Sequence, residues 1–250
     1  CTRDLVVFPS VLTPILIGRA ESKELANMLE QNPETVFCIF CQKHADIDSP
    51  NQEDLYETGT FAKLMRVINM PNDEHQKTII VQGLGRCKMK QIVDKEPFYL
   101  ADVESLPETW PTEKEAEDPM FKALTQTFFE ESIKFIQYNE NIPNEAVYAI
   151  NEITNRFVKC NFICTSLPFT AEDKIKMLEQ EKLSERLIEA LKALHKEQKL
   201  LYLQNEIRNK TQFDLDEQQK EYYLKQQIKN IKEELGEGES LSLIHISEPT

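Results

Sequence analysis

Glycine is scarce in this chain, with only 6 among 250 residues. None of the six stands in a G-x-x-x-x-G-K-[S/T] loop, whose backbone N–H groups would hold phosphates, or in the G-x-S-x-G turn that exposes a nucleophilic serine. No serine stands in a setting that predicts a Ser–Lys pair, in which a desolvated lysine activates the hydroxyl. We therefore expect no catalytic residue and no cofactor-binding residue in this chain.

Long apolar runs are also missing. The longest, at residues 36–41, has about six residues, whereas a membrane-spanning helix needs about 20. The chain starts at Cys1 without the basic and apolar segments of a secretory signal peptide. These features predict a soluble, cytoplasmic protein with no membrane partner.

A basic surface is absent as well. The 43 Asp and Glu residues outnumber the 29 Lys and Arg residues, and the formal net charge is −14. Binding to nucleic acid depends on clustered Lys and Arg side chains that neutralise phosphates. We therefore do not expect nucleic acid as a partner.

The six cysteines do not form the dense framework of a small secreted protein, which favours a reducing environment. Cys38 and Cys41 have the C-x-x-C spacing of a zinc or redox motif, but beyond His44 no further ligand follows nearby. Residues three apart in a strand also face opposite sides of a sheet. We interpret both thiols as core residues and expect no metal site.

Residues 1–106 are rich in strand-forming patterns. Apolar, β-branched runs between turn residues predict strands at 4–8, 11–17, 36–41, 60–68, 78–82, 86–93 and 100–106. The spacing of Leu25, Met28 and Leu29 predicts a short helix over 22–31. Gly83 and Gly85 flank Leu84, which predicts a bulge or a sharp bend. Together these elements predict a compact, partly closed sheet.

Residues 107–118 contain two prolines and five acidic residues, a composition typical of a linker. Beyond it the apolar period becomes helical. Asp118 and Pro119 form a helix start, with a capping oxygen and a proline at the first turn. Apolar residues at helical spacing continue over 147–164, which predicts one helix there, and Thr170 with Asp173 resembles a capping box. The fold class predicted for the whole chain is α+β, with a helical bundle over 119–183.

A long helix is predicted from Ser184 onward, with a weak point at 209–216. Leu224, Ile228, Ile231 and Leu235 lie at spacings of four, three and four, as in a coiled-coil seam. A straight helix over 184–235 would measure roughly 78 Å at 1.5 Å per residue. Such a helix is too long to pack along its whole length on a small domain, so we expect it to contact a partner chain or the rest of a larger protein. The tail at 240–250 drops both charge and heptads, and we interpret it as artefactual.

The amino-acid sequences of four segments resemble the amino-terminal region of the Lon family of ATP-dependent serine proteases. These segments are 4–9 with 14–15 and 18–19, then 54–60, 81–86 and 221–235. In order, they span nearly the whole chain up to Glu239. The resemblance implies a LON substrate-binding domain of pseudo-barrel shape at 1–106, the linker at 107–118, the bundle at 119–183 and a coiled coil at 184–239.

The same resemblance implies a function for the whole protein. Lon proteases are hexamers that use ATP and Mg to degrade misfolded and regulatory proteins, and their amino-terminal region selects unfolded or damaged substrates and supports assembly. The family usually has an extra strand's worth of residues before Asp4 and an ATPase module after Glu239. We therefore expect a chain truncated at both ends, which binds polypeptides and is not itself an enzyme.

Three residues are candidates for substrate contact. Leu84 lies between two glycines in a predicted loop, although those glycines can equally serve the backbone geometry. Tyr222 and Tyr223 bring aromatic surface to the coil, although packing against a neighbouring helix would also explain them. Two other functions stay open. One is a stand-alone LON-domain module that binds a small molecule or peptide, and the other is a coiled-coil scaffold.

Overall fold

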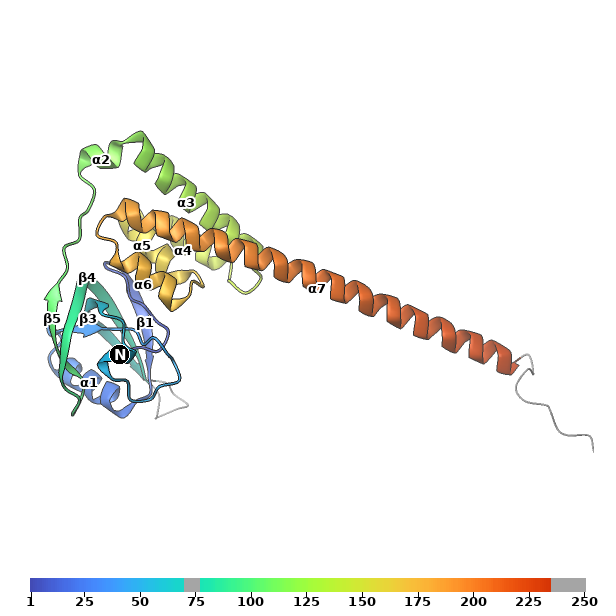
Figure 1. Cartoon of the computed structure of the whole chain (residues 1–250), viewed down its shortest axis with the longest axis horizontal. Helices are drawn as coiled ribbons and strands as arrows, with labels where there is room; N and C mark the ends of the chain where they lie inside the picture. The colour runs from blue at the N-terminus through green and yellow to red at the C-terminus, as the bar shows by residue number, and fades with distance from the viewer. Residues whose placement is uncertain (70–76, 235–250) are drawn as a thin grey trace, which may run out of the picture. The chain divides into compact units, whose positions relative to one another are not determined.

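The computed structural model describes residues 1–69 and 77–234 (Figure 1). These residues belong to two units, of which the first comprises 1–198 and the second begins at Lys199. The sequence predictions for Leu235 and for the tail at 240–250 lie outside the described residues. The mixed content of helix and antiparallel sheet confirms the predicted α+β class.

Five antiparallel strands form one sheet in the order β1-β4-β3-β2, and β5 pairs with the far half of β4. The strands are β1 (Leu12–Ile17), β2 (Val36–Ile39), β3 (Thr58–Asn69), β4 (Lys77–Asp94) and β5 (Leu100–Ser105). β1 lies along residues 77–82 of β4, and β5 lies along residues 87–94 of the same strand. Among the described strands no ladder joins the two ends of the sheet, so the sheet stays open.

Two strand predictions need correction. The strands expected at 78–82 and 86–93 are one strand, β4, because the main chain pairs with β3 on both sides of Gly83 and Gly85. Residues 4–8 are buried at Val6, Val7 and Phe8 but join no ladder. The Val7 carbonyl instead accepts a hydrogen bond of 2.6 Å from the Thr60 hydroxyl.

The bulge predicted around Leu84 is confirmed. Phe61 of β3 lies opposite Gly85 and the next residue, Ala62, lies opposite Gly83, so Leu84 has no partner on β3. Gly83 allows a close approach of two main chains at this point. A Cβ atom on Gly83 would lie 2.2 Å from the Phe8 carbonyl oxygen, so only glycine fits.

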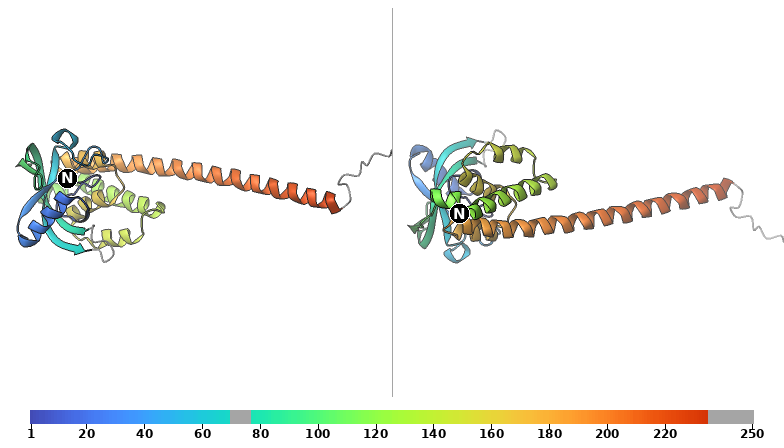
Figure 2. Two further views of the ribbon diagram at one scale, coloured as in Figure 1. Left: turned by 90° about the horizontal axis from the view of Figure 1, so that it is seen from below. Right: turned by 90° about the horizontal axis from the view of Figure 1, so that it is seen from above.

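Helix α1 (Ala20–Gln31) covers one face of the sheet, and its Ala26 and Leu29 are buried there. The core beneath it combines inward residues of the strands, namely Val7, Ile15, Ile17, Ile39, Ala62, Leu64, Ile79 and Val81. Helix α6 (Ala171–Glu179) lies at the opposite end of the strands from α1, as Figure 1 shows, and Figure 2 gives two further views. There Arg86 of β4 donates to the Leu178 carbonyl oxygen at 3.0 Å.

The remaining helices are η1 (Gln52–Asp54), α2 (Glu113–Glu117), α3 (Pro119–Tyr138), α4 (Glu145–Glu152), α5 (Arg156–Ser166), α6 (Ala171–Glu179) and α7 (Leu183–Glu234). Both predicted helix starts are confirmed. The Asp118 carboxylate accepts a hydrogen bond from Phe121 N, and the Thr170 hydroxyl accepts one of 3.1 Å from Asp173 N.

Two helix predictions were wrong. The single helix expected over 147–164 is interrupted, because residues 153–155 are non-helical and the Asn155 side chain caps α5 by accepting from Phe157 N at 2.9 Å. The weak point expected at 209–216 is continuous helix within α7. No glycine or proline interrupts that stretch, and the Gln212 amide donates to the Asp216 carboxylate one turn later.

Candidate functional site

An exposed apolar surface lies on the side of the sheet away from α1. Along β1 the burial alternates, with Thr13, Ile15 and Ile17 buried and the residues between them exposed. The exposed residues are Leu12, Pro14 and Leu16, and the two leucines are 57% and 59% exposed. A row of apolar side chains therefore faces solvent along the whole strand.

The neighbouring strands extend this surface. Pro14 lies opposite Ile80 of β4, which is half-buried, and Leu16 lies opposite Thr78. On the far side of β4, the exposed Ile68 of β3 also lies opposite Thr78. We call this surface, made by Leu12, Pro14, Leu16, Ile68, Ile80 and Leu84, the outer face.

Leu84 belongs to the outer face because of its place on β4. It directly follows Gly83, whose main chain hydrogen-bonds with Ser10 and Val11 just before β1. Its side chain is 45% exposed. The structure thus brings the predicted candidate Leu84 next to β1. Whether it contacts a substrate stays a prediction.

The size of the exposed area sets what the outer face can contribute to binding. Complete burial of a leucine side chain is worth about 1.5–3 kcal/mol. Leu12 and Leu16 are each more than half exposed, so covering them would contribute about 1 kcal/mol apiece. This is enough for weak binding of an apolar segment at one site.

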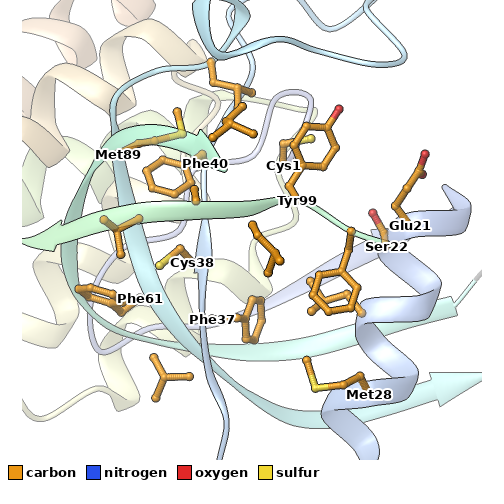
Figure 3. Close-up of a pocket in the computed structure, with 18 of the residues that line it drawn as sticks. Cys1, Glu21, Ser22, Met28, Phe37, Cys38, Phe40, Phe61, Met89 and Tyr99 are labelled. Carbon is orange, nitrogen blue, oxygen red and sulfur yellow. The ribbon is translucent and has the colours of Figure 1, made fainter. Parts of the chain in front are cut away.

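A cavity of about 490 Å³ lies elsewhere in the first unit, between α1, β2 and β5 (Figure 3). Its walls are mostly apolar and include Phe37, Phe40, Phe61, Met28 and Met89. The exposed Cys1 also lines it, and Thr2 pairs in parallel with Cys41.

The second unit, described here over 199–234, is a helix with many exposed apolar side chains. Leu224, Ile228 and Ile231 are each about half exposed, as a seam without a partner in the described chain would be. Tyr222 and Tyr223 are 66% and 62% exposed. Their hydroxyls accept hydrogen bonds from Gln226 and Gln227 one turn later. Both tyrosines are thus accessible, and substrate contact by them stays a prediction.

The cysteine residues are all free thiols. Cys41, Cys87, Cys160 and Cys164 are buried, Cys38 is half-buried and Cys1 is exposed. Burial raises the pKa of Cys41 to about 11 and that of Cys164 to about 12. Within the described residues no group of three His, Cys, Asp or Glu side chains could hold a metal ion.

Comparison with known proteins decides which family this fold represents. Residues 1–196 match the family model of the ATP-dependent protease La (LON) substrate-binding domain. That match covers well over half of the chain. The chain belongs to the LON substrate-binding domain family.

Relatives of this LON domain carry the name Lon protease. The protein of Flavobacterium johnsoniae is 34% identical over 234 residues, which is 94% of this chain and 28% of the relative. The protein of Porphyromonas gingivalis is 34% identical over 235 residues, again 94% of this chain and 27% of the relative. The chain therefore spans little more than a quarter of the length of these relatives.

Solved structures support the LON fold. The N-terminal domain of the Lon protease from Mycobacterium avium complex has a TM-score of 0.52 at 18% identity, over 78% of this chain and 95% of that domain. A Lon N-terminal domain protein from Xanthomonas campestris has a TM-score of 0.50 at 10% identity, over 76% of this chain and 96% of that one. At these identities the likeness shows the fold alone.

Sequence reasoning named Leu84 as a candidate but did not name Leu12, Pro14 or Leu16. It predicted a strand over 11–17, but apolar residues occupy both faces of that strand, so the alternation did not reveal an exposed side. Among the described residues, none of the helices is both long enough and apolar enough to cross a membrane.

Proposed function

We propose that this LON domain is the substrate-recognition and assembly region of an ATP-dependent serine protease that degrades misfolded and regulatory proteins. The outer face would bind apolar segments that unfolded or damaged polypeptides expose. The observation that carries this proposal is the row of exposed apolar side chains on β1, in a chain whose family is described as substrate-binding. A large exposed apolar patch on a water-facing surface is typical of an interaction site.

Weak binding at one outer face suits a quality-control function. Each contact would contribute only about 1 kcal/mol per leucine, so a single domain would hold many different sequences and release them readily. Several domains in one assembly would multiply this affinity, because a polypeptide bound at one site is held at high local concentration near the others. The selectivity would then be for exposed apolar segments in general.

The seam on α7 supports the assembly part of the proposal. Leu224, Ile228 and Ile231 keep coiled-coil spacing and are exposed in the described chain, so they would pack against a second helix. In the whole protein we propose a hexamer in the cytoplasm, with ATP and Mg bound by parts outside these residues. The purified chain should then neither hydrolyse ATP nor cleave peptides, and either activity at a rate that follows the protein through purification would contradict the proposal.

Two variants with matched exposure test the outer face. Leu16→Ser removes a side chain that is 59% exposed on β1, and Val93→Ser removes one that is 60% exposed at the far end of β4. Binding is measured by the fluorescence anisotropy of a labelled, reduced and carboxymethylated protein that cannot fold. We expect Leu16→Ser to weaken binding about fivefold, as the loss of about 1 kcal/mol requires, and Val93→Ser to leave it unchanged.

The double variant Leu12→Ser with Leu16→Ser should weaken binding about 20-fold while its circular dichroism spectrum stays that of the parent. Unchanged affinity in this double variant would refute the assignment of substrate binding to the outer face. An equal loss of affinity in Val93→Ser would show that any exposed apolar residue supports binding.

A further inference from the structure

Two arginines from different elements meet at the carboxyl end of α6. The Arg186 side chain, from the first turn of α7, is buried and donates to the carbonyl oxygens of Met177 (3.2 Å) and Gln180 (3.3 Å). Its Nη1 also donates to the Asn161 side chain at 2.9 Å and to the Glu108 carboxylate at 3.0 Å. A fully buried guanidinium is thereby held by partners from three segments of the chain, namely the end of α6, α5 and the residues after β5.

Arg86 reaches the same helix end from the sheet. This residue of β4 is buried, and its Nη1 donates to the carbonyl oxygens of Leu178 and Glu179, both at 3.0 Å. Its Nη2 donates to the carbonyl oxygen of Pro107. Burial, together with the neighbouring Arg186 cation, lowers the pKa of Arg86.

The two arginines together occupy the successive carbonyl oxygens of residues 177–180. The Met177 carbonyl oxygen also accepts from Gln180 N at 3.3 Å. The last carbonyls of a helix carry the negative end of its dipole, so they attract cations. Arg86 contributes its cation from the sheet, and Arg186 contributes the other from α7. The end of α6 therefore serves as a common acceptor for both.

Further contacts tie the same elements together. The Thr109 main chain donates to the Glu181 carbonyl oxygen at 3.3 Å, and its hydroxyl donates to the Glu181 carboxylate at 2.8 Å. The Asn161 amide donates to the Pro9 carbonyl oxygen at 3.0 Å. The residues after β5 are thus held between the sheet and the start of α7.

We propose that Arg86 and Arg186 are positioning residues of a joint that makes the sheet and the first turns of α7 move as one body. On the function proposed above, on which its biological meaning rests, the joint would pass a displacement of α7 directly to the outer face. Both guanidiniums are planar and hold their acceptors in fixed directions, so they specify an orientation as well as a distance.

Replacing a buried charge network by apolar side chains often leaves stability unchanged, so stability alone does not explain why two arginines are used. Orientation offers an explanation, because the carbonyl groups at the end of one helix accept from two cations that come from different elements. The joint therefore predicts coupling between the two parts, beyond their separate stabilities.

The buried thiols of the chain can measure this coupling. Cys87 lies in the sheet and Cys164 lies in α5, and both are fully buried. Thiols react with iodoacetamide only when the surrounding structure opens, so labelling followed by peptide mass spectrometry reports the opening of each part separately. In mild urea we expect Cys87 and Cys164 of the unmodified chain to be labelled at the same rate and with the same dependence on urea.

The variant Arg86→Met should separate the two rates, so that one thiol is labelled at least tenfold faster than the other. Glu108→Gln, which removes the negative charge beside Arg186 and leaves both arginines in place, should separate them by a smaller factor and serves if Arg86→Met does not fold. A role in stability alone would speed both thiols by the same factor, and that result, or no change in either rate, overturns the proposal. The assay contains no substrate, so it stands or fails independently of the binding experiment on Leu16.

Discussion

The two glycines around Leu84 have different neighbours, and this makes a sharp test of the fold. A methyl group on Gly83 would lie 2.2 Å from the Phe8 carbonyl oxygen and 3.0 Å from the Phe8 carbonyl carbon. Both atoms belong to main chain, so neither can rotate away. For Gly85 nothing lies within 4 Å of the added methyl group.

The cost of Gly83→Ala follows from what must move. The two main chains would separate by about 1 Å to reach ordinary contact, a strain that typically costs 1–3 kcal/mol. That movement also stretches the hydrogen bonds from Gly83 N to the Val11 carbonyl oxygen (3.0 Å) and from Ser10 N to the Gly83 carbonyl oxygen (2.9 Å). Each is worth about 1 kcal/mol and is weakened rather than lost, so we expect a total loss of about 3 kcal/mol.

Urea unfolding followed by circular dichroism measures this loss. With a slope of about 3 kcal/mol per molar urea, Gly83→Ala should lower the midpoint by about 1 M. Gly85→Ala should leave the midpoint unchanged or raise it slightly, because alanine restricts the unfolded chain without meeting any atom in the folded one. If the free energy of unfolding of Gly83→Ala lies within about 1 kcal/mol of the parent value, the close approach at Phe8 does not constrain the sheet. An equal loss in Gly85→Ala would mean that this part of β4 tolerates no side chain at either position.

Two further predictions concern the helices and the buried thiols. Thr170→Ala should lower the free energy of unfolding by about 1 kcal/mol, because it removes the oxygen that accepts from Asp173 N at the start of α6. Thr170→Ser keeps an oxygen there and should retain most of the stability. Equal losses in both variants would contradict the cap. The raised pKa values of Cys41 (about 11) and Cys164 (about 12) mean that unfolded thiols ionise near their ordinary value of 9.0 while folded ones stay protonated. Their contribution to stability is present in full below pH 9.0 and is lost as the pH rises toward 11 or 12. Cys164→Ala should therefore reduce the fall in unfolding free energy between pH 8 and 10.5. An unchanged fall would refute this account.

Local chemistry explains which elements could be predicted from the sequence. Asp118 with Pro119 and Thr170 with Asp173 act within one helical turn, so their residue types alone predicted the helix starts. The interruption before α5 depends equally on one residue, Asn155, but the apolar spacing on both sides of it concealed the break. The bulge at Leu84 could be predicted because glycines on both sides are rare in a strand.

Contacts between distant segments could not be predicted. Arg86 and Arg186 read in the sequence as two of many charged residues, and their burial depends on partners up to 93 and 78 positions away. The exposed side of β1 escaped prediction for a similar reason, because the side that α1 covers is decided only when the sheet has formed. The division into domains at 107–118 stays a prediction, and the structure shows Pro107 to Thr109 engaged in hydrogen bonds within the first unit.

The length of β4 also bears on how this sheet can assemble. Its first residues pair with β1 and its last ones with β5, while β3 accompanies most of it on the other flank. The β3–β4 hairpin joins segments close in sequence, whereas β1 must close a loop of about sixty residues to reach its place, which is entropically more costly. The hairpin is therefore the natural template, and the apolar row of β1 joins the molecule late. On the proposed function, a newly made chain would form its scaffold before it completes the surface that binds other unfolded chains.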